Sequence, residues 1–403
     1  MPTPRRRCLL VAALVAGLAG HAAAQAIDRP YALAIGPVSL GGEVSAVLGP
    51  ADDTVFFNYT DYEHNALRMA RLRLAAEWRL RPALSLLGEV RAENLDDVEA
   101  AGLYVRWRPW ADRGWTVQAG RVPPVIGAFA RRAYGRDNPL PGTPLAYQYL
   151  TSLRPDALPA VPDDLLRMRG RGWRPSYPIG AATIAPGVPL VQAVRWDTGV
   201  QLSWRSARWD AAGAVTRGAP AVPVVAETNG GVQISGRVAA HLPGGLMLGV
   251  SGAQGAWIDE QALSHRPGDA RQDFLQRVWG LDVEYGAGRW LWRGEWVAAA
   301  FDLPLATAGA TMRLAAHSGF AELRYRPAPR WQLAARAGRL GFGRLDGAAT
   351  GVRWEHPVSR LEASLGFRVS RQLDARVGWQ HNWRDDGRGT SRGYPAVQLL
   401  YWF

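Results

Sequence analysis

Lysine is absent from this 403-residue chain, and cysteine occurs only once, as Cys8. A single cysteine cannot form a disulfide within the chain, and it excludes metal sites built from cysteine pairs. All 47 basic residues are therefore arginine, a bias that a G+C-rich genome would also produce. Long apolar runs are missing as well. No stretch of about 18 apolar residues is present, so we expect no transmembrane helix.

Motifs of catalysis and nucleotide binding are also missing. The sequence contains no GxSxG, Walker A or GxGxxG motif, and its histidines lack the spacing of metal ligands. We therefore predict neither an enzyme nor a metal or cofactor protein, with a hydrolase as the alternative. The arginines are dispersed along the chain, which argues against nucleic-acid binding. With 48% hydrophobic and 20% charged residues, the composition excludes intrinsic disorder and a collagen-like repeat.

The first 24 residues have the composition of a targeting segment. Three arginines at 5–7 precede an apolar stretch over 9–20, and small residues follow it. This order predicts a secretory signal peptide over 1–24, with cleavage after Ala24 or Ala26. Its removal lowers the formal net charge of +12 by three and leaves a mature chain over 25–403 without cysteine. A buried N-terminal helix is the alternative.

Alternation with a period of two recurs along the mature chain and predicts antiparallel strands. In the segment 66–80, Leu72 and Trp78 share one face, whereas Arg71 and Arg73 occupy the other. Sixteen such segments are predicted, at 32–48, 66–80, 84–94, 100–108, 115–122, 190–204, 209–217, 231–242, 246–255, 276–286, 290–300, 315–326, 331–340, 358–369, 373–383 and 394–403. The even number returns both termini to the same side.

Fourteen and eighteen strands are the alternatives, because the patterns of 32–48, 246–255 and 358–369 are the weakest. Short turns alternate with long polar loops, and a basic residue followed by tryptophan begins the strand after several short turns. These tryptophans form a predicted membrane girdle at Trp115, Trp209, Trp290 and Trp331. Together the patterns predict an all-β, transmembrane, antiparallel up-and-down β-barrel, since only a closed barrel satisfies strand edges in lipid. A soluble β-sandwich is the alternative.

The last segment, 394–403, places Val397, Leu399, Tyr401 and Phe403 on one face. A strand that ends on an aromatic residue resembles the terminal strand recognised by the barrel-assembly machinery of Gram-negative bacteria. The resemblance implies insertion into the outer membrane, in contact with its lipid and lipopolysaccharide. Tyr401 and Phe403 therefore join the predicted girdle.

The longest predicted loop, 123–189, follows the fifth strand. The segment from Val117 to Gly127, with its Gly120-Arg121 step, resembles a porin strand that runs into its constriction loop. It is similar to general porins and to the phosphate-selective porin O and P group. The resemblance implies a loop that folds inward and narrows a water-filled channel, and it implies a homotrimer. Phosphate specificity does not follow, because that group uses lysines. An extracellular flap is the alternative for the loop.

The arginines on inward faces and in the loop are the candidate pore and constriction residues, because charged rings set the sign of the ions that a pore passes. They are Arg71, Arg73, Arg106, Arg121, Arg131, Arg132, Arg136, Arg167, Arg169, Arg171, Arg293 and Arg324. A planar guanidinium suits small anionic solutes that carry carboxylate or phosphate. We therefore predict an anion-leaning porin for passive diffusion. Individually, each arginine has pairing with a glutamate as its alternative role.

The sequence leaves two further points open. One is a largely closed barrel, plugged by its long loop, with a role in substrate-specific binding, adhesion or structure. The other concerns the acidic residues Glu93, Asp96, Asp97 and Glu99, with Asp52 and Asp53, which are predicted in external loops. They would bind divalent cations that bridge lipopolysaccharide, or form a solvated loop.

Overall fold

The computed structural model describes most of the chain beyond residue 32. The described ranges are 33–54, 56–60, 64–95, 97–110, 112–133, 135–222, 231–264, 266, 268–306, 310–345 and 351–403. The predicted signal peptide over 1–24 and Cys8 lie outside these residues. In the described part, no helix has the length and apolar composition needed to cross a membrane.

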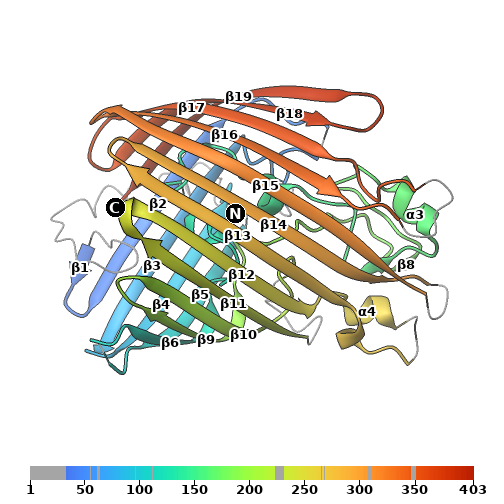
Figure 1. The fold of residues 1–403 in the computed structure, drawn as a ribbon, viewed down its shortest axis with the longest axis horizontal. Helices are drawn as coiled ribbons and strands as arrows, with labels where there is room; N and C mark the ends of the chain where they lie inside the picture. Colours follow the sequence, from blue (N-terminus) through green and yellow to red (C-terminus); the bar gives the residue numbers. More distant parts are fainter. Residues whose placement is uncertain are drawn as a thin grey trace, which may run out of the picture.

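Sixteen antiparallel strands close into one barrel (Figure 1), as the alternation pattern predicts. They are β2 (Val38–Leu48), β3 (Met69–Arg81), β4 (Leu84–Glu93), β5 (Asp97–Trp107), β6 (Trp115–Val122), β9 (Asp197–Arg205), β10 (Trp209–Arg217), β11 (Val232–Leu242), β12 (Leu246–Ala256), β13 (Leu275–Ala287), β14 (Trp290–Pro304), β15 (Thr311–Ala328), β16 (Trp331–Phe342), β17 (Val358–Arg368), β18 (Leu373–Arg384) and β19 (Thr390–Trp402). Strand β19 pairs with β2 and closes the barrel. The short β1 (Leu33–Ile35) pairs with the start of β2.

The three segments with the weakest alternation are strands β2, β12 and β17, so the count of sixteen is confirmed. Two predicted strand starts are wrong. Strand β2 begins at Val38 and not at residue 32, because Gly36 has a positive φ in the turn after β1, and β9 begins at Asp197 and not at residue 190. The amides of Leu190 and Val191 both donate to the carbonyl of Ala146, at 3.1 Å. The apolar alternation at 190–196 therefore reflects packing inside the barrel, and these residues belong to the long loop.

The two ends of the barrel differ in their connections. Short turns and the C-terminus lie at one end, which we call the turn end; the helices α3 (Pro162–Arg167) and α4 (Glu260–Leu263) lie at the other, the outer end (Figure 1). Two short 3-10 helices also lie in connections outside the long loop. They are η2 (Pro243–Gly245), between β11 and β12, and η3 (Arg271–Asp273), between α4 and β13.

The outward faces of the strands carry large exposed apolar side chains. Trp279 is 64% exposed, Val377 59% and Leu281 54%, whereas Glu295 and Arg336 on inward faces are almost fully buried. A soluble protein exposes no apolar surface of this extent, but a lipid bilayer covers one. The soluble-sandwich alternative is therefore excluded by the closed sheet and its apolar exterior.

The long loop between β6 and β9 enters the barrel, as predicted. It contains η1 (Phe129–Arg132), α2 (Leu145–Gln148), β7 (Ala157–Leu158), α3 and β8 (Ile179–Gly180). All four residues of α2 are buried. The loop between β16 and β17 packs on this core too, since the Phe342 ring lies 4.7 Å from that of Trp354 and 6.4 Å from that of Tyr149. The hydrophobic core thus fills part of the barrel interior, which excludes an external flap for this part of the loop.

Candidate channel through the barrel

One side of the barrel interior holds the long loop in place. We call the inward faces of β12, β14, β16, β17 and β18 the docking wall. The buried guanidinium groups of this wall donate to loop carbonyl oxygens at 2.7–2.8 Å, as Arg336 to Gly142, Arg360 to Thr143 and Arg376 to Asn138. Each of the three arginines is 2% exposed, so loss of these acceptors would leave donors buried without partners.

A carboxylate in the docking wall binds the start of the loop. Glu295 accepts hydrogen bonds from the amides of Ala128 and Phe129 and from the hydroxyl of Tyr147. The amide of Gly127 donates to the hydroxyl of Ser251 at 3.2 Å. Because the loop backbone is bonded to several strands, it is held across the lumen as a fixed element.

The opposite side, the inward faces of β2 to β6, carries a row of charges that we call the open wall. Register places Glu43, Arg73, Arg91 and Glu99 side by side on four successive strands. Glu89 bonds both central arginines, at 2.9 Å to Arg73 and 3.0 Å to Arg91. Two like charges can occupy neighbouring positions because this carboxylate bridges them.

A cavity of about 70 Å³ lies between the open wall and the loop. Beside it the two are joined, since Glu43 accepts from the loop amides of Gly135 at 2.8 Å and Arg136 at 3.0 Å. Arg71, Arg73 and Arg91 line it on the wall side, and Asn138 and Leu140 on the loop side. Its lining also includes three glutamates, Glu43, Glu93 and Glu99. This space between loop and wall is therefore small, and its three arginines are balanced by three glutamates.

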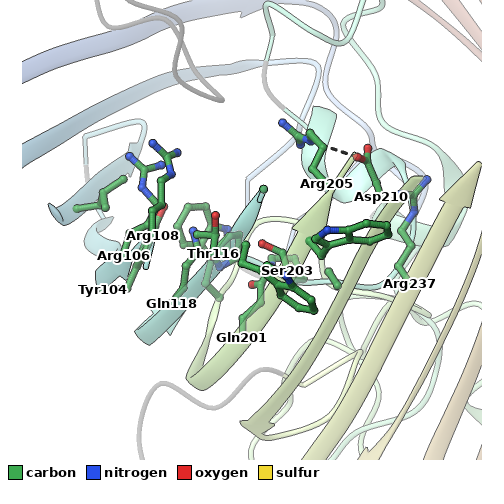
Figure 2. Close-up of a pocket in the computed structure, with 18 of the residues that line it drawn as sticks. Tyr104, Arg106, Arg108, Thr116, Gln118, Gln201, Ser203, Arg205, Asp210 and Arg237 are labelled. Atoms are coloured by element: carbon green, nitrogen blue, oxygen red, sulfur yellow. Dashed lines mark hydrogen bonds and ion pairs between the residues drawn. The ribbon is translucent and has the colours of Figure 1, made fainter. Parts of the chain in front are cut away.

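A second cavity, of about 930 Å³, lies along β3 to β6 and β9 to β11. Figure 2 shows Arg106, Arg108, Arg205 and Arg237 among the charged and polar side chains that line it. Glu89 lines this larger cavity, while its partners Arg73 and Arg91 line the smaller one. The bridged group of Arg73, Glu89 and Arg91 thus lies between the two spaces.

The predicted wall arginines lie on strands, and most form ion pairs. Arg71 lies 3.2 Å from Glu93, and Arg73 bonds Glu89 as described. For the others, Arg106 lies 2.6 Å from Glu77, Arg293 lies 2.8 Å from Glu284, and Arg324 is half-buried on β15. At least four of these five wall arginines therefore pair with a glutamate, which is the alternative role of each residue.

The predicted loop arginines form two groups: one lies on the first part of the loop, near η1, and the other lies at the outer end, near α3. Arg132 pairs with Glu284 at 2.7 Å inside the barrel, where burial lowers the pKa of its guanidinium. Arg136 is exposed and lies over the Trp402 ring at 5.6 Å. The side chain of Arg131, in η1, lies outside the described part. Arg121, on β6, donates to the carbonyl of Trp196 at 3.0 Å.

Arg167, Arg169 and Arg171 lie at the outer end, within or just after α3. Arg167 pairs with Asp164, and Arg169 donates to the carbonyl of Arg353 at 3.2 Å. None of the three lines either cavity described above. The reason is topological, because the chain leaves the lumen before α3 begins, and sequence spacing alone does not show that exit.

The predicted girdle residues lie near the turn end. Trp209, Trp290 and Trp331 are 43–47% exposed on outward faces, and Trp115 and Tyr401 are half-buried. Phe403 differs, since it is only 7% exposed. Its carbonyl accepts from the amide of Gly42 at 3.0 Å, and its ring lies against that residue.

Of the acidic residues expected in external loops, Asp52 and Asp53 lie in the loop between β2 and β3, whereas Glu93 and Glu99 lie on strands. Glu93 ends β4 and pairs with Arg71, and Glu99 lies within β5 with its side chain in the small cavity. The prediction is wrong because Asn94 and Leu95, both with positive φ, make a tight hairpin where a longer loop is expected. Asp52 is also buried, and it accepts from the amides of Phe57 and Asn58. Asp96 lies outside the described residues, and nothing is placed for cation binding there.

Three residues of the site are missing from the sequence prediction. They are Arg91, Glu43 and Trp196, whose ring lies 5.5 Å from the Arg91 guanidinium and 6.2 Å from the Tyr104 ring. Arg91 has the same strand parity as Glu89 and Glu93, so alternation could have indicated it. Trp196 could not be found this way, because it lies in the loop. The described residues contain no group of three or more metal-ligating side chains.

Solved structures share this architecture. The chain matches OmpT, an outer membrane protein of Vibrio cholerae, with a TM-score of 0.54 and 10% identity over 94% of this chain and 99% of that one. It matches the outer membrane channel DcaP of Acinetobacter baumannii (TM-score 0.52, 10% identity, 91% and 97% covered). It also matches an anion-selective porin from Comamonas acidovorans (0.53, 12%, 91% and 99%). No family model and no curated protein matches. The fold is that of the outer-membrane porins.

Proposed function

We propose that the chain forms a water-filled channel in the outer membrane of a Gram-negative bacterium, for passive diffusion of small hydrophilic solutes. The observation that carries the proposal is the pair of cavities, lined by charged side chains, on the side of the lumen opposite the wall whose buried arginines bond the loop. Barrels of 16 to 18 strands are wide enough for an aqueous channel. The open wall would line that channel, and the docked loop would be its constriction.

A preference for anions is supported by the larger cavity. Four arginines and two acidic residues, Glu89 and Asp210, line it. Two of these arginines also pair with carboxylates outside the lining, as Arg106 with Glu77 and Arg237 with Asp282, so the excess is partly compensated. One similar structure is that of an anion-selective porin. We propose that solutes with carboxylate or phosphate groups pass most readily.

Export and assembly belong to the same proposal. The predicted signal peptide would carry the chain across the inner membrane, and the C-terminal strand would engage the barrel-assembly machinery. A homotrimer is supported by the resemblance to general porins and by the trimer form of one similar OmpT structure. Trp209, Trp290 and Trp331 would lie at a lipid–water interface.

The test is single-channel conductance and reversal potential of the refolded protein in a planar bilayer under a KCl gradient. Stable open steps with a reversal potential that favours chloride are expected. A reversal potential that favours potassium would overturn the proposed anion preference. A bilayer that shows no conductance, although the protein is folded and heat-modifiable, would overturn the proposed open channel.

A plugged barrel is the second candidate, because the cavity between loop and open wall holds only about 70 Å³. Deletion of 130–175 separates the two candidates. Conductance that rises from a measurable value supports a constricted channel, and conductance that appears only after the deletion supports a plug. Binding of an external ligand would then replace diffusion as the function.

A further inference from the structure

The short turns of the barrel are strongly basic. Within the described residues, the turns that join strands at the turn end contain six arginines, Arg108, Arg113, Arg208, Arg289, Arg330 and Arg371, and one acidic residue, Asp112. The outer-end loops other than the long loop contain nine acidic and six basic described residues. With the long loop set aside, the connections are therefore net basic at the turn end and net acidic at the outer end.

Three of these arginines have the same setting on the molecule. Arg208, Arg289 and Arg330 are exposed, and each immediately precedes an outward tryptophan that begins a strand. These tryptophans are exposed by 47% at Trp209 and 43% at Trp290. Within the described part, none of the three arginines forms an ion pair.

Two of the three tryptophans pack on aromatic neighbours. The ring of Trp290 stacks on that of Tyr325, with centroids 4.1 Å apart, and the ring of Trp331 lies 4.8 Å from that of Phe367. Arg289 donates one hydrogen bond, to the carbonyl of Pro327 at 2.6 Å. A guanidinium has five N–H donors, so this bond fixes the group and leaves most of its donors for another acceptor.

We propose that this basic rim, defined as Arg208, Arg289 and Arg330 with their tryptophans, binds the phosphate groups of anionic phospholipids. The inference rests on the proposed membrane location, in which the short turns border the phospholipid leaflet. Tryptophan marks the headgroup level of a bilayer, and the arginine beside it lies at the edge of the apolar surface. Its planar fork donates to phosphate oxygens in pairs.

A soluble polyanion or the carboxylates of the cell wall would also be attracted to a basic rim. The lipid is favoured because the arginines adjoin side chains on the outward, apolar face of the barrel. An arginine near an anionic bilayer surface strengthens binding by roughly fivefold. The three lie on turns between β9 and β16, where they would hold a row of anionic lipids.

The experiment compares two triple variants of the full chain in lipid vesicles. R208Q/R289Q/R330Q removes the rim charges, and R344Q/R388Q/R392Q removes three exposed charges at the outer end as a control. Each folded barrel is reconstituted with brominated phosphatidylglycerol or brominated phosphatidylcholine, and quenching of tryptophan fluorescence gives the relative affinity for the anionic lipid. Heat-modifiable migration on gels identifies folded protein.

The wild type and the control are expected to prefer phosphatidylglycerol several-fold, and the rim variant is expected to lose most of that preference. An equal loss in both variants, or no preference in the wild type, would overturn the proposal. Retained lipid preference with lost binding to isolated cell-wall sacculi would also overturn it, in favour of the wall. Lipid preference does not need an open pore, so a silent bilayer with intact preference would contradict only the proposed channel.

Discussion

The two walls of the lumen use the same residue type in different ways. On the docking wall, Arg360 is buried and donates to four neutral oxygens, those of Phe57, Thr143, Gln148 and Asn382. On the open wall, Arg73 and Arg91 share the carboxylate of Glu89 beside two cavities. Arginine bonded to neutral oxygens fastens one segment to another, whereas arginine bridged by a carboxylate beside a cavity sets the electrostatic field of that cavity. The partners therefore decide the role.

The largest effect is expected from loss of a fastening arginine. Arg360→Leu leaves four acceptors without their donor in a buried place, which should lower the free energy of unfolding by about 3 kcal/mol. Urea unfolding followed by gel migration measures it. Arg388→Leu, at an exposed position, is the control and should change stability by less than about 0.5 kcal/mol. Equal stability of the two variants would show that the docking wall does not depend on this arginine.

The next effect concerns the open wall. The double substitution Arg73→Gln with Arg91→Gln removes two positive charges beside the small cavity. We expect the chloride-to-potassium permeability ratio to fall about fivefold. Reversal potential under a KCl gradient measures the ratio, and Arg388→Gln serves as the control. An unchanged ratio would place the selectivity at another level of the lumen.

A smaller effect of opposite sign is expected from the bridging carboxylate. Glu89→Gln removes one negative charge from between the two cavities and keeps the size of the side chain. The chloride-to-potassium ratio should rise about twofold, and less at high salt because mobile ions screen the wall charges. A fall in the ratio would mean that Glu89 only positions the arginines.

The smallest effect is expected at the outer end, where the long loop contacts Glu355 away from both walls. Burial raises the pKa of Glu355 to about 7, and this side chain accepts from the amides of Gly170 and His356 at 2.8 and 2.7 Å. Because the pKa is raised, the folded state favours the protonated acid, so the contact is most stable at acidic pH and weakens as pH rises toward and through 7. Hydrogen exchange of the Gly170 amide should increase several-fold between pH 5.5 and 7, beyond the intrinsic change. Glu355→Gln should abolish that dependence, and an unchanged dependence in the variant would contradict the assignment.

Local patterns predicted the barrel well, because the face of each residue in a strand depends only on its parity. The alternation around Trp78 and Arg73 is visible within a few residues, and so is the tight turn near Gly288. Docking partners are different. The bond from Arg336 to Gly142 joins residues 194 positions apart, and no local pattern indicates it. The same limit explains why the sequence places Arg167 among the constriction residues, and why it predicts a strand that includes the apolar residues 190–196.

The seam between the first and last barrel strands has a consequence for the order of folding. Strands β2 and β19 pair over only six residues, from Val397 opposite Leu48 to Trp402 opposite Glu43. A Cβ at Gly42 would lie 2.5 Å from the Phe403 ring, so a larger residue there would displace that terminal ring from the seam. Its partners are more than 300 residues apart, which makes closure the slowest contact to find. Until it forms, two unpaired strand edges are open to aggregation, and the cell has to shield them during biogenesis.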